Sequence, residues 1–178
     1  MKIKKIVTDP NPVLRTPCTD LESFDSEVQE RVRKMFKLMY RTGHGVGLAA
    51  PQVGWSVRLF VMNPDVHTCR PQEEKIFWNP EIVGFHGEKV LMKEGCLSAP
   101  GKWGKVLRYP SVTMKAMSPM GPVEETFTEL AAQIVQHEVG HLNGQMCIDL
   151  FEKEESDGQE AEGEKEDSIG DSMDCSED

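Results

Sequence analysis

The pattern His137-Glu138-Val139-Gly140-His141 places the strongest constraint on how this chain folds. In an α-helix, residues four apart lie one turn apart on the same face, so both imidazoles can reach one metal ion. Glu138 stands beside them, where a carboxylate can take a proton from water held at that ion. A catalytic ion has three protein ligands and one open position. We therefore expect this helix to meet a third ligand from another part of the chain.

Two cysteines are candidates for the third ligand. Cys96 lies in a Glu-Gly-Cys-Leu-Ser segment and would leave one position open. Cys147 extends the helix pattern to His-x-x-x-His-x-x-Gly-x-x-Cys, which is similar to the metzincin peptidase motif with cysteine in place of the last histidine. Cys147 also suits a plain core position, because Met146 and Ile148 flank it. The spacing alone leaves these alternatives open.

Composition limits the class of protein. The five cysteines are scattered and odd in number, which favours a reducing compartment over a disulfide framework. No apolar run approaches the roughly 20 residues that a membrane span requires, and the basic start lacks the apolar core of a signal peptide. We therefore predict a cytoplasmic protein without a membrane partner, or an organellar one if a transit peptide has been removed.

Acidic residues are concentrated at the end of the chain. Residues 152–178 hold 13 acidic residues and two lysines, a net charge of −11, whereas the whole chain carries −10. Residues 1–151 are therefore nearly neutral and give no sign of a sequence-specific nucleic-acid partner. The end segment has too few apolar side chains to offset its ordering entropy. We predict a catalytic domain over residues 1–151 and an acidic, disordered tail over residues 152–178.

Apolar periodicity predicts a helix near the N-terminus, over residues 23–41. Ser23, Asp25 and Ser26 are candidate caps at its start. The glycines that follow it end the helix and open a loop. The apolar stripe consists of Val28, Val32, Met35, Phe36 and Met39.

A second long helix carries the histidine pair. Thr126 and Glu129 have the spacing of a capping box, so this helix should start near Thr126 or Thr128, and Asn143-Gly144 should end it. Strand-like runs separated by Gly, Pro and Asn, as at Asn79-Pro80, cover residues 57–62, 75–85, 88–92, 105–117 and 123–127. We predict an α+β fold in which short, mostly antiparallel strands surround a central metal-binding helix, with the other helix N-terminal to them.

Three segments together resemble the signature motifs of the peptide deformylase family. They occupy residues 45–54, 94–98 and 136–142, in the order that the family has. The resemblance covers residues 1–151. It implies a metal-dependent hydrolase that removes the formyl group from formylmethionine at the N-terminus of nascent polypeptides and releases formate. A metzincin-like metallopeptidase would account for the last motif only and is the alternative enzyme.

The resemblance also implies a metal site. One divalent ion per chain would be held by Cys96, His137 and His141. Fe²⁺ is the expected native ion, and Zn²⁺ or Ni²⁺ could replace it, because a mixed sulfur and nitrogen ligand set accepts all three. Glu138 would then transfer protons during hydrolysis.

Further residues are implied to bind the substrate and the transition state. The side chain of Gln52 and the backbone N–H of Leu97 would donate to the oxyanion. The peptide would bind as an added strand, with its methionine side chain in an apolar pocket. The residues expected to contact it are Gly45, Val46, Gly47, Glu94, Leu130 and Ile134. The implied partners are the N-formylmethionyl peptide, the ribosome and the nascent chain, and the implied state is a monomer.

Two departures from the family pattern bear on activity. Gly140 stands where the family usually has an aspartate that pairs with an arginine, and Arg108 keeps the spacing of that arginine. Arg108 must therefore be solvated or find another carboxylate. Trp103 stands where many relatives have a substrate-binding arginine, a role that Lys102 or Lys105 could take. An inactive deformylase-like protein that only binds peptides is the non-enzyme alternative.

Overall fold

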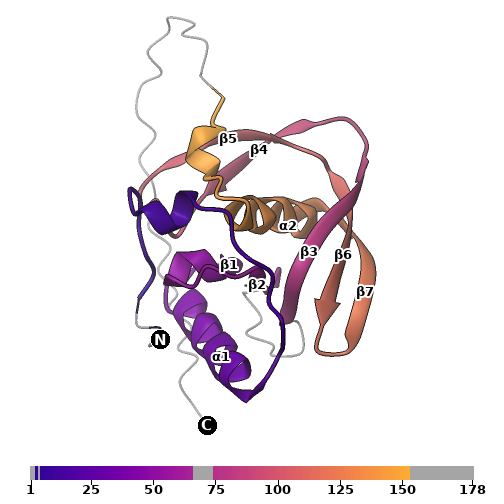
Figure 1. Cartoon of the computed structure of the whole chain (residues 1–178). Helices are drawn as coiled ribbons and strands as arrows, with labels where there is room; N and C mark the ends of the chain where they lie inside the picture. Colours follow the sequence, from indigo (N-terminus) through magenta and orange to yellow (C-terminus); the bar gives the residue numbers. More distant parts are fainter. Residues whose placement is uncertain (1–2, 4, 66–73, 153–178) are drawn as a thin grey trace, which may run out of the picture.

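The structure is a computed structural model, which describes residues 3, 5–65 and 74–152 (Figure 1). The predicted acidic tail therefore lies outside the described residues, apart from Glu152. Within the described part, no helix is long and apolar enough to cross a membrane.

The N-terminal helix α1 spans Ser26–Tyr40. It begins after Asp25, whose side chain accepts a hydrogen bond of 2.9 Å from the backbone N–H of Val28. Its buried residues are the five members of the predicted stripe, so the amphipathic prediction is confirmed. The stripe packs on one core cluster together with Leu48, Leu59 and Val61.

Seven strands form two sheets in the described residues, and every strand pair is antiparallel. A five-stranded sheet has the order β1-β2-β3-β6-β7, and β4 pairs with β5 separately. The α+β prediction with mostly antiparallel strands is therefore confirmed. The strands are β1 (Gly47–Ala49), β2 (Leu59–Met62), β3 (Lys75–His86), β4 (Val90–Gly95), β5 (Trp103–Arg108), β6 (Ser111–Ser118) and β7 (Gly121–Thr128).

Two strand boundaries differ from the sequence prediction. The run predicted over residues 105–117 divides between β5 and β6 at Tyr109-Pro110, and the two halves pair with different strands. Asn79-Pro80, expected to separate strands, lies inside β3, where the register shifts between Trp78 and Glu81. Asn79 has a positive φ of 49°. Its side-chain oxygen accepts a hydrogen bond from the backbone N–H of Leu21, and its side-chain nitrogen donates one to the backbone carbonyl of Leu21. A bulge therefore accommodates the proline within the strand.

Helix α2 spans Glu129–Leu142 and carries both histidines. Its start after Thr128 and its end at Asn143-Gly144 agree with the prediction. The predicted capping box is wrong, because Thr126 belongs to β7 and its Oγ1 lies 2.9 Å from Oγ1 of Thr113 on β6. Pairing of β6 with β7 continues to Thr128, so strand hydrogen bonds replace the local cap.

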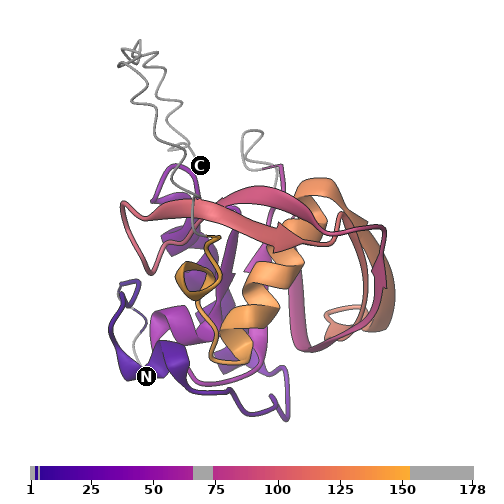
Figure 2. The ribbon, with the colours of Figure 1, turned by 90° about the horizontal axis from the view of Figure 1, so that it is seen from above.

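The position of α2 determines the position of the site. In Figure 1, β4 and β5 lie on one side of α2, and β1 and β2 lie on the other. Figure 2 shows the curved strands β3, β6 and β7 gathered at one end of the helix. Apolar residues of α2, among them Val135 and Leu142, pack with Phe60, Met114 and Phe127 of the sheet. The helix is thus fixed in the core, with the His137 side meeting the end of β4.

Candidate active site

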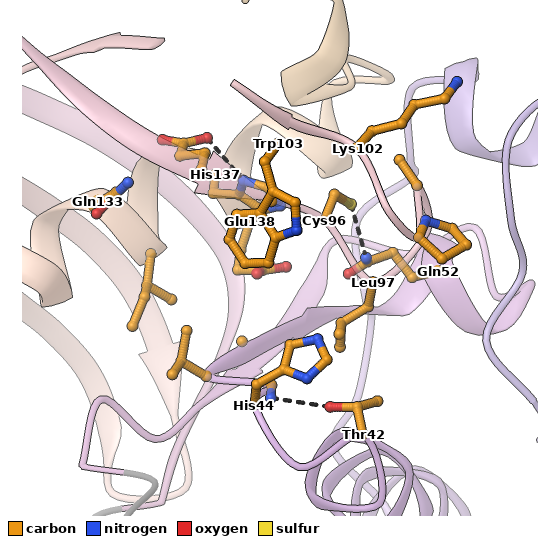
Figure 3. Close-up of a pocket in the computed structure, with 18 of the residues that line it drawn as sticks. Thr42, His44, Gln52, Cys96, Leu97, Lys102, Trp103, Gln133, His137 and Glu138 are labelled. Atoms are coloured by element: carbon orange, nitrogen blue, oxygen red, sulfur yellow. Dashed lines mark hydrogen bonds and ion pairs between the residues drawn. The ribbon is translucent and has the colours of Figure 1, made fainter. Parts of the chain in front are cut away.

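A pocket of about 480 Å³ opens beside α2 (Figure 3). Its walls come from the loop before β1, from β1 and the turn after it, from the β4–β5 connection and from α2. All six residues predicted to contact the substrate line this pocket. The predicted catalytic residues Gln52, Leu97 and Glu138 line it as well, together with Cys96 and His137.

Cys96 and His137 line the pocket, and His141 is buried next to both of them. Nε2 of His141 lies 3.2 Å from Nε2 of His137 and 3.2 Å from Sγ of Cys96. Ligand atoms around a tetrahedral ion are about 3.4–3.7 Å apart when metal–nitrogen bonds are about 2.1 Å and metal–sulfur bonds about 2.3 Å. Burial lowers the pKa of His141, which favours the neutral form of the ring that a metal ligand requires. The donor set therefore fits a divalent ion.

Cys147 lies behind Cys96 and belongs to the same cluster. It begins the 3₁₀ helix Cys147–Asp149 and packs with Cys96, Leu14 and Met146. The two sulfur atoms and one ring nitrogen of His137 all lie within 4.8 Å of one another. Hydrogen bonding to Cys147, followed by burial, raises the pKa of the Cys96 thiol. Both cysteines predicted as alternatives are thus at the site, and Sγ of Cys96 lies 3.2 Å from Nε2 of His141.

A buried ion-pair network orients His137. Its Nδ1 lies 3.0 Å from Oε2 of Glu94, and Arg108 donates to both oxygens of Glu94, at 2.7 Å from Nε and 3.0 Å from Nη2. Burial alone would raise the pKa of Glu94, but hydrogen bonds from His137 and Arg108 outweigh it and hold the pKa at about 2. Arg108 has thus found another carboxylate in the absence of one at position 140. Glu94 lines the pocket, yet its carboxylate is engaged by protein partners.

Glu138 is buried against the first strand of the sheet. Its Oε2 has no hydrogen-bond partner among the described residues, and burial raises its pKa to about 7. Gly47 leaves room for this carboxylate, because a Cβ at that position would meet Glu138 and would lie 2.9 Å from Cγ2 of Ile134. A carboxylate with a free oxygen beside the histidines suits proton transfer.

The Gln52 amide is oriented by its neighbours. Its Oε1 accepts a hydrogen bond of 2.8 Å from the backbone N–H of Ala49. Its Nε2 lies 3.5 Å from Sγ of Cys96 (Figure 3). The same Nε2 lies 3.2 Å from Oγ of Ser98. The amide N–H₂ group therefore faces the cysteine end of the pocket.

Trp103 and His44 complete the pocket rim. Trp103 keeps 59% of its surface exposed, and its ring covers Gly95, where a Cβ would lie 2.8 Å from ring carbons. Nζ of Lys93 lies 5.7 Å from the centre of this ring, and Lys102 also lines the pocket. Sequence reasoning did not identify His44, because a lone histidine in a glycine-rich loop carries no distinguishing spacing.

Two histidines of one helix and a cysteine, placed beside a buried glutamate, would give a divalent ion the surroundings found in metal-dependent hydrolases. The family model for polypeptide deformylase matches residues 3–157, and the chain belongs to this family. This membership replaces the metzincin alternative, which accounts for one motif only.

Individual relatives agree with this assignment. The peptide deformylase of Pseudothermotoga lettingae is 40% identical over 150 residues, which are 84% of this chain and 83% of the relative. A crystal structure of the Plasmodium falciparum enzyme aligns with a TM-score of 0.80 and 39% identity, over 84% of this chain and 87% of that one. The Synechococcus elongatus enzyme, solved in complex with actinonin, aligns with a TM-score of 0.79 and 32% identity, over 84% and 81%.

Proposed function

We propose that this chain hydrolyses the formyl amide of N-formylmethionyl peptides at one divalent ion held by Cys96, His137 and His141. The observation that carries the proposal is the pair of 3.2 Å separations from Nε2 of His141 to the donor atoms of Cys96 and His137, two residues that line an apolar pocket. A bound ion would supply an acidified water as the nucleophile at neutral pH. Fe²⁺ is our proposal for the native ion, with Zn²⁺ or Ni²⁺ as substitutes.

Glu138 is proposed to move the proton. Its free oxygen accepts a proton from the attacking water and returns it to the departing amine nitrogen. Oxygen adds to the formyl carbon, the carbon–nitrogen bond then breaks, and formate and the free peptide amine result.

Gln52 and Leu97 are proposed to stabilise the oxyanion. The Gln52 amide is anchored through Oε1, so its N–H₂ group stays beside Cys96 and Ser98. The Leu97 backbone N–H lies one residue beyond the proposed ligand Cys96. Loss of one such donor typically costs about 10²–10³ in rate.

The pocket is proposed to bind the methionine side chain. Val46, Leu130 and Ile134 supply apolar surface, while Gly45 and Gly47 allow the peptide backbone to approach as an added strand. Formylmethionine occurs at the start of new chains, so we propose that the protein acts as a cytoplasmic monomer near the ribosome. We propose residues 1–151 as the catalytic domain and residues 152–178 as an appended tail.

Formate release tests this function. Protein purified without oxygen and loaded with Fe²⁺ should release formate from a formyl-Met-Ala-Ser peptide, and actinonin should inhibit the release. Glu138→Ala should retain the metal and lose about 10²–10⁴ in rate. A wild-type chain that binds the ion and the peptide without releasing formate would instead be the inactive peptide-binding protein.

A further inference from the structure

Cys96 and Cys147 bring two thiols together from separate parts of the chain. Cys96 directly follows β4, and Cys147 begins the short 3₁₀ helix after α2. Their sulfur atoms lie within 4.8 Å of each other, and neither is in a disulfide. The hydrolytic chemistry uses only Cys96, so it leaves the second thiol without a role.

The two thiols differ in access from solvent. Cys96 lines the pocket, so a small molecule that enters the pocket reaches its sulfur (Figure 3). Cys147 is 3% exposed and lies behind Cys96 among Leu14, Val106 and Met146. An oxidant from solvent therefore meets Cys96 first.

We propose that Cys147 is a resolving thiol, which converts an oxidised Cys96 into a reversible Cys96–Cys147 disulfide. The oxidant is a hydroperoxide, for which hydrogen peroxide is the simplest example. Disulfide formation does not depend on the proposed deformylase activity. Only its effect on metal retention depends on the proposed role of Cys96 as a ligand.

The chemistry balances in two steps. The Cys96 sulfur attacks one peroxide oxygen, the oxygen–oxygen bond breaks, and a sulfenic acid and one water form. The Cys147 sulfur then attacks the Cys96 sulfur, the sulfur–oxygen bond breaks, and a second water leaves with the Cys147 proton. Overall, two thiols lose two electrons and two protons to one peroxide.

The resolving thiol would decide whether oxidation is reversible. A sulfenic acid without a nearby thiol proceeds to sulfinic and sulfonic acids, which ordinary reductants do not restore. A disulfide is opened again by a dithiol. Because the disulfide withdraws Cys96 from the donor set, oxidation would also release the ion, and reduction would allow it to be reloaded.

The test uses the full chain loaded with Zn²⁺, which does not itself react with peroxide. After exposure to hydrogen peroxide, free thiols are alkylated, and peptides are mapped by mass spectrometry while a chromophoric chelator records released Zn²⁺. We expect a linked peptide pair containing Cys96 and Cys147, zinc release in step with it, and recovery of both thiols with dithiothreitol.

Two variants serve as matched comparisons. In Cys147→Ala, Cys96 should gain two or three oxygen atoms and should not recover, whereas Cys18→Ala should behave as the wild type. Pairing of Cys96 with another cysteine, absence of the linked peptide in the wild type, or full recovery of Cys96 in Cys147→Ala would each overturn the proposal. These readouts require no deformylation, so they stand apart from the test of the proposed function.

Discussion

Arg108 and Glu94 form a buried bidentate ion pair, with distances of 2.7 Å and 3.0 Å between their nitrogen and oxygen atoms. The second of these oxygens also lies 3.0 Å from Nδ1 of His137. One carboxylate therefore neutralises the arginine and fixes the ring of a proposed metal ligand. Such outer contacts set the orientation of ligating histidines and tune their affinity for the ion.

The first prediction concerns this carboxylate. Glu94→Gln removes its negative charge, so Arg108 is left buried without a counter-charge and His137 loses its charged partner. We expect metal affinity to fall about 10–100-fold, measured by competition with a chelator of known affinity. Glu124→Gln is the control, because its pairing with Lys115 is exposed, at 3.6 Å. Equal metal affinity in the two variants would show that Glu94 does not position His137.

The second prediction separates the two cysteines. Cys96→Ala should abolish binding of one ion per chain, because Sγ of Cys96 is the sulfur that lies 3.2 Å from Nε2 of His141. Cys147→Ala should retain most of the binding, since Cys147 lies behind that sulfur. The metal content of each dialysed variant, measured by elemental mass spectrometry, distinguishes Cys96→Ala from Cys147→Ala. Loss of metal in Cys147→Ala with retention in Cys96→Ala would reverse our ligand assignment.

The third prediction concerns the end of the described chain. The Phe151 ring covers Gly104 of β5, and the backbone N–H of Glu152 donates to the carbonyl of Lys105 at 2.8 Å. A chain ending at Glu152 should therefore match the full chain in melting temperature and kcat, because the removed residues have little apolar surface to bury. A chain ending at Leu150 should melt lower, since it loses the aromatic contact. Thermal unfolding of the full chain and of the two shortened chains measures the melting temperatures, and formate release measures kcat.

Local sequence patterns predicted some of these features well and others poorly. The α1 stripe and the end of α2 follow from periodicity and from Asn143-Gly144, which are local signals. The capping box at Thr126 failed because pairing with a neighbouring strand, which no local pattern encodes, extended β7 through that residue.

The site required information from distant segments. The helix pattern alone could not choose between Cys96 and Cys147, and the family motifs were needed to favour Cys96. The partner of Arg108 was also unpredicted, because Glu94 and Arg108 are brought together by the folding of the β4–β5 hairpin. Residue spacing can indicate which groups take part, whereas tertiary packing decides which groups meet.

The last prediction concerns Gly140 in the last turn of α2. The family usually has at this position an aspartate that pairs with an arginine, but Arg108 already binds both oxygens of Glu94. A Cβ at position 140 would meet no atom closer than the backbone oxygen of Gln145, at 3.7 Å, so a small side chain fits. Gly140→Ala should therefore stabilise the chain by up to about 1 kcal/mol through helix propensity alone.

Gly140→Asp should gain less than Gly140→Ala, because the nearest atoms to its Cβ are the backbone and side-chain oxygens of Gln145, which repel a carboxylate. Gly144→Ala is a control that should destabilise the chain. Gly144 has a φ of 76°, and a Cβ there would lie 2.9 Å from the backbone of Arg15, so this change should lower the melting temperature. Chemical denaturation gives the free energy of unfolding of each of the three variants, and these values rank their stabilities. A larger gain for aspartate than for alanine would mean that Arg108 exchanges Glu94 for the new carboxylate.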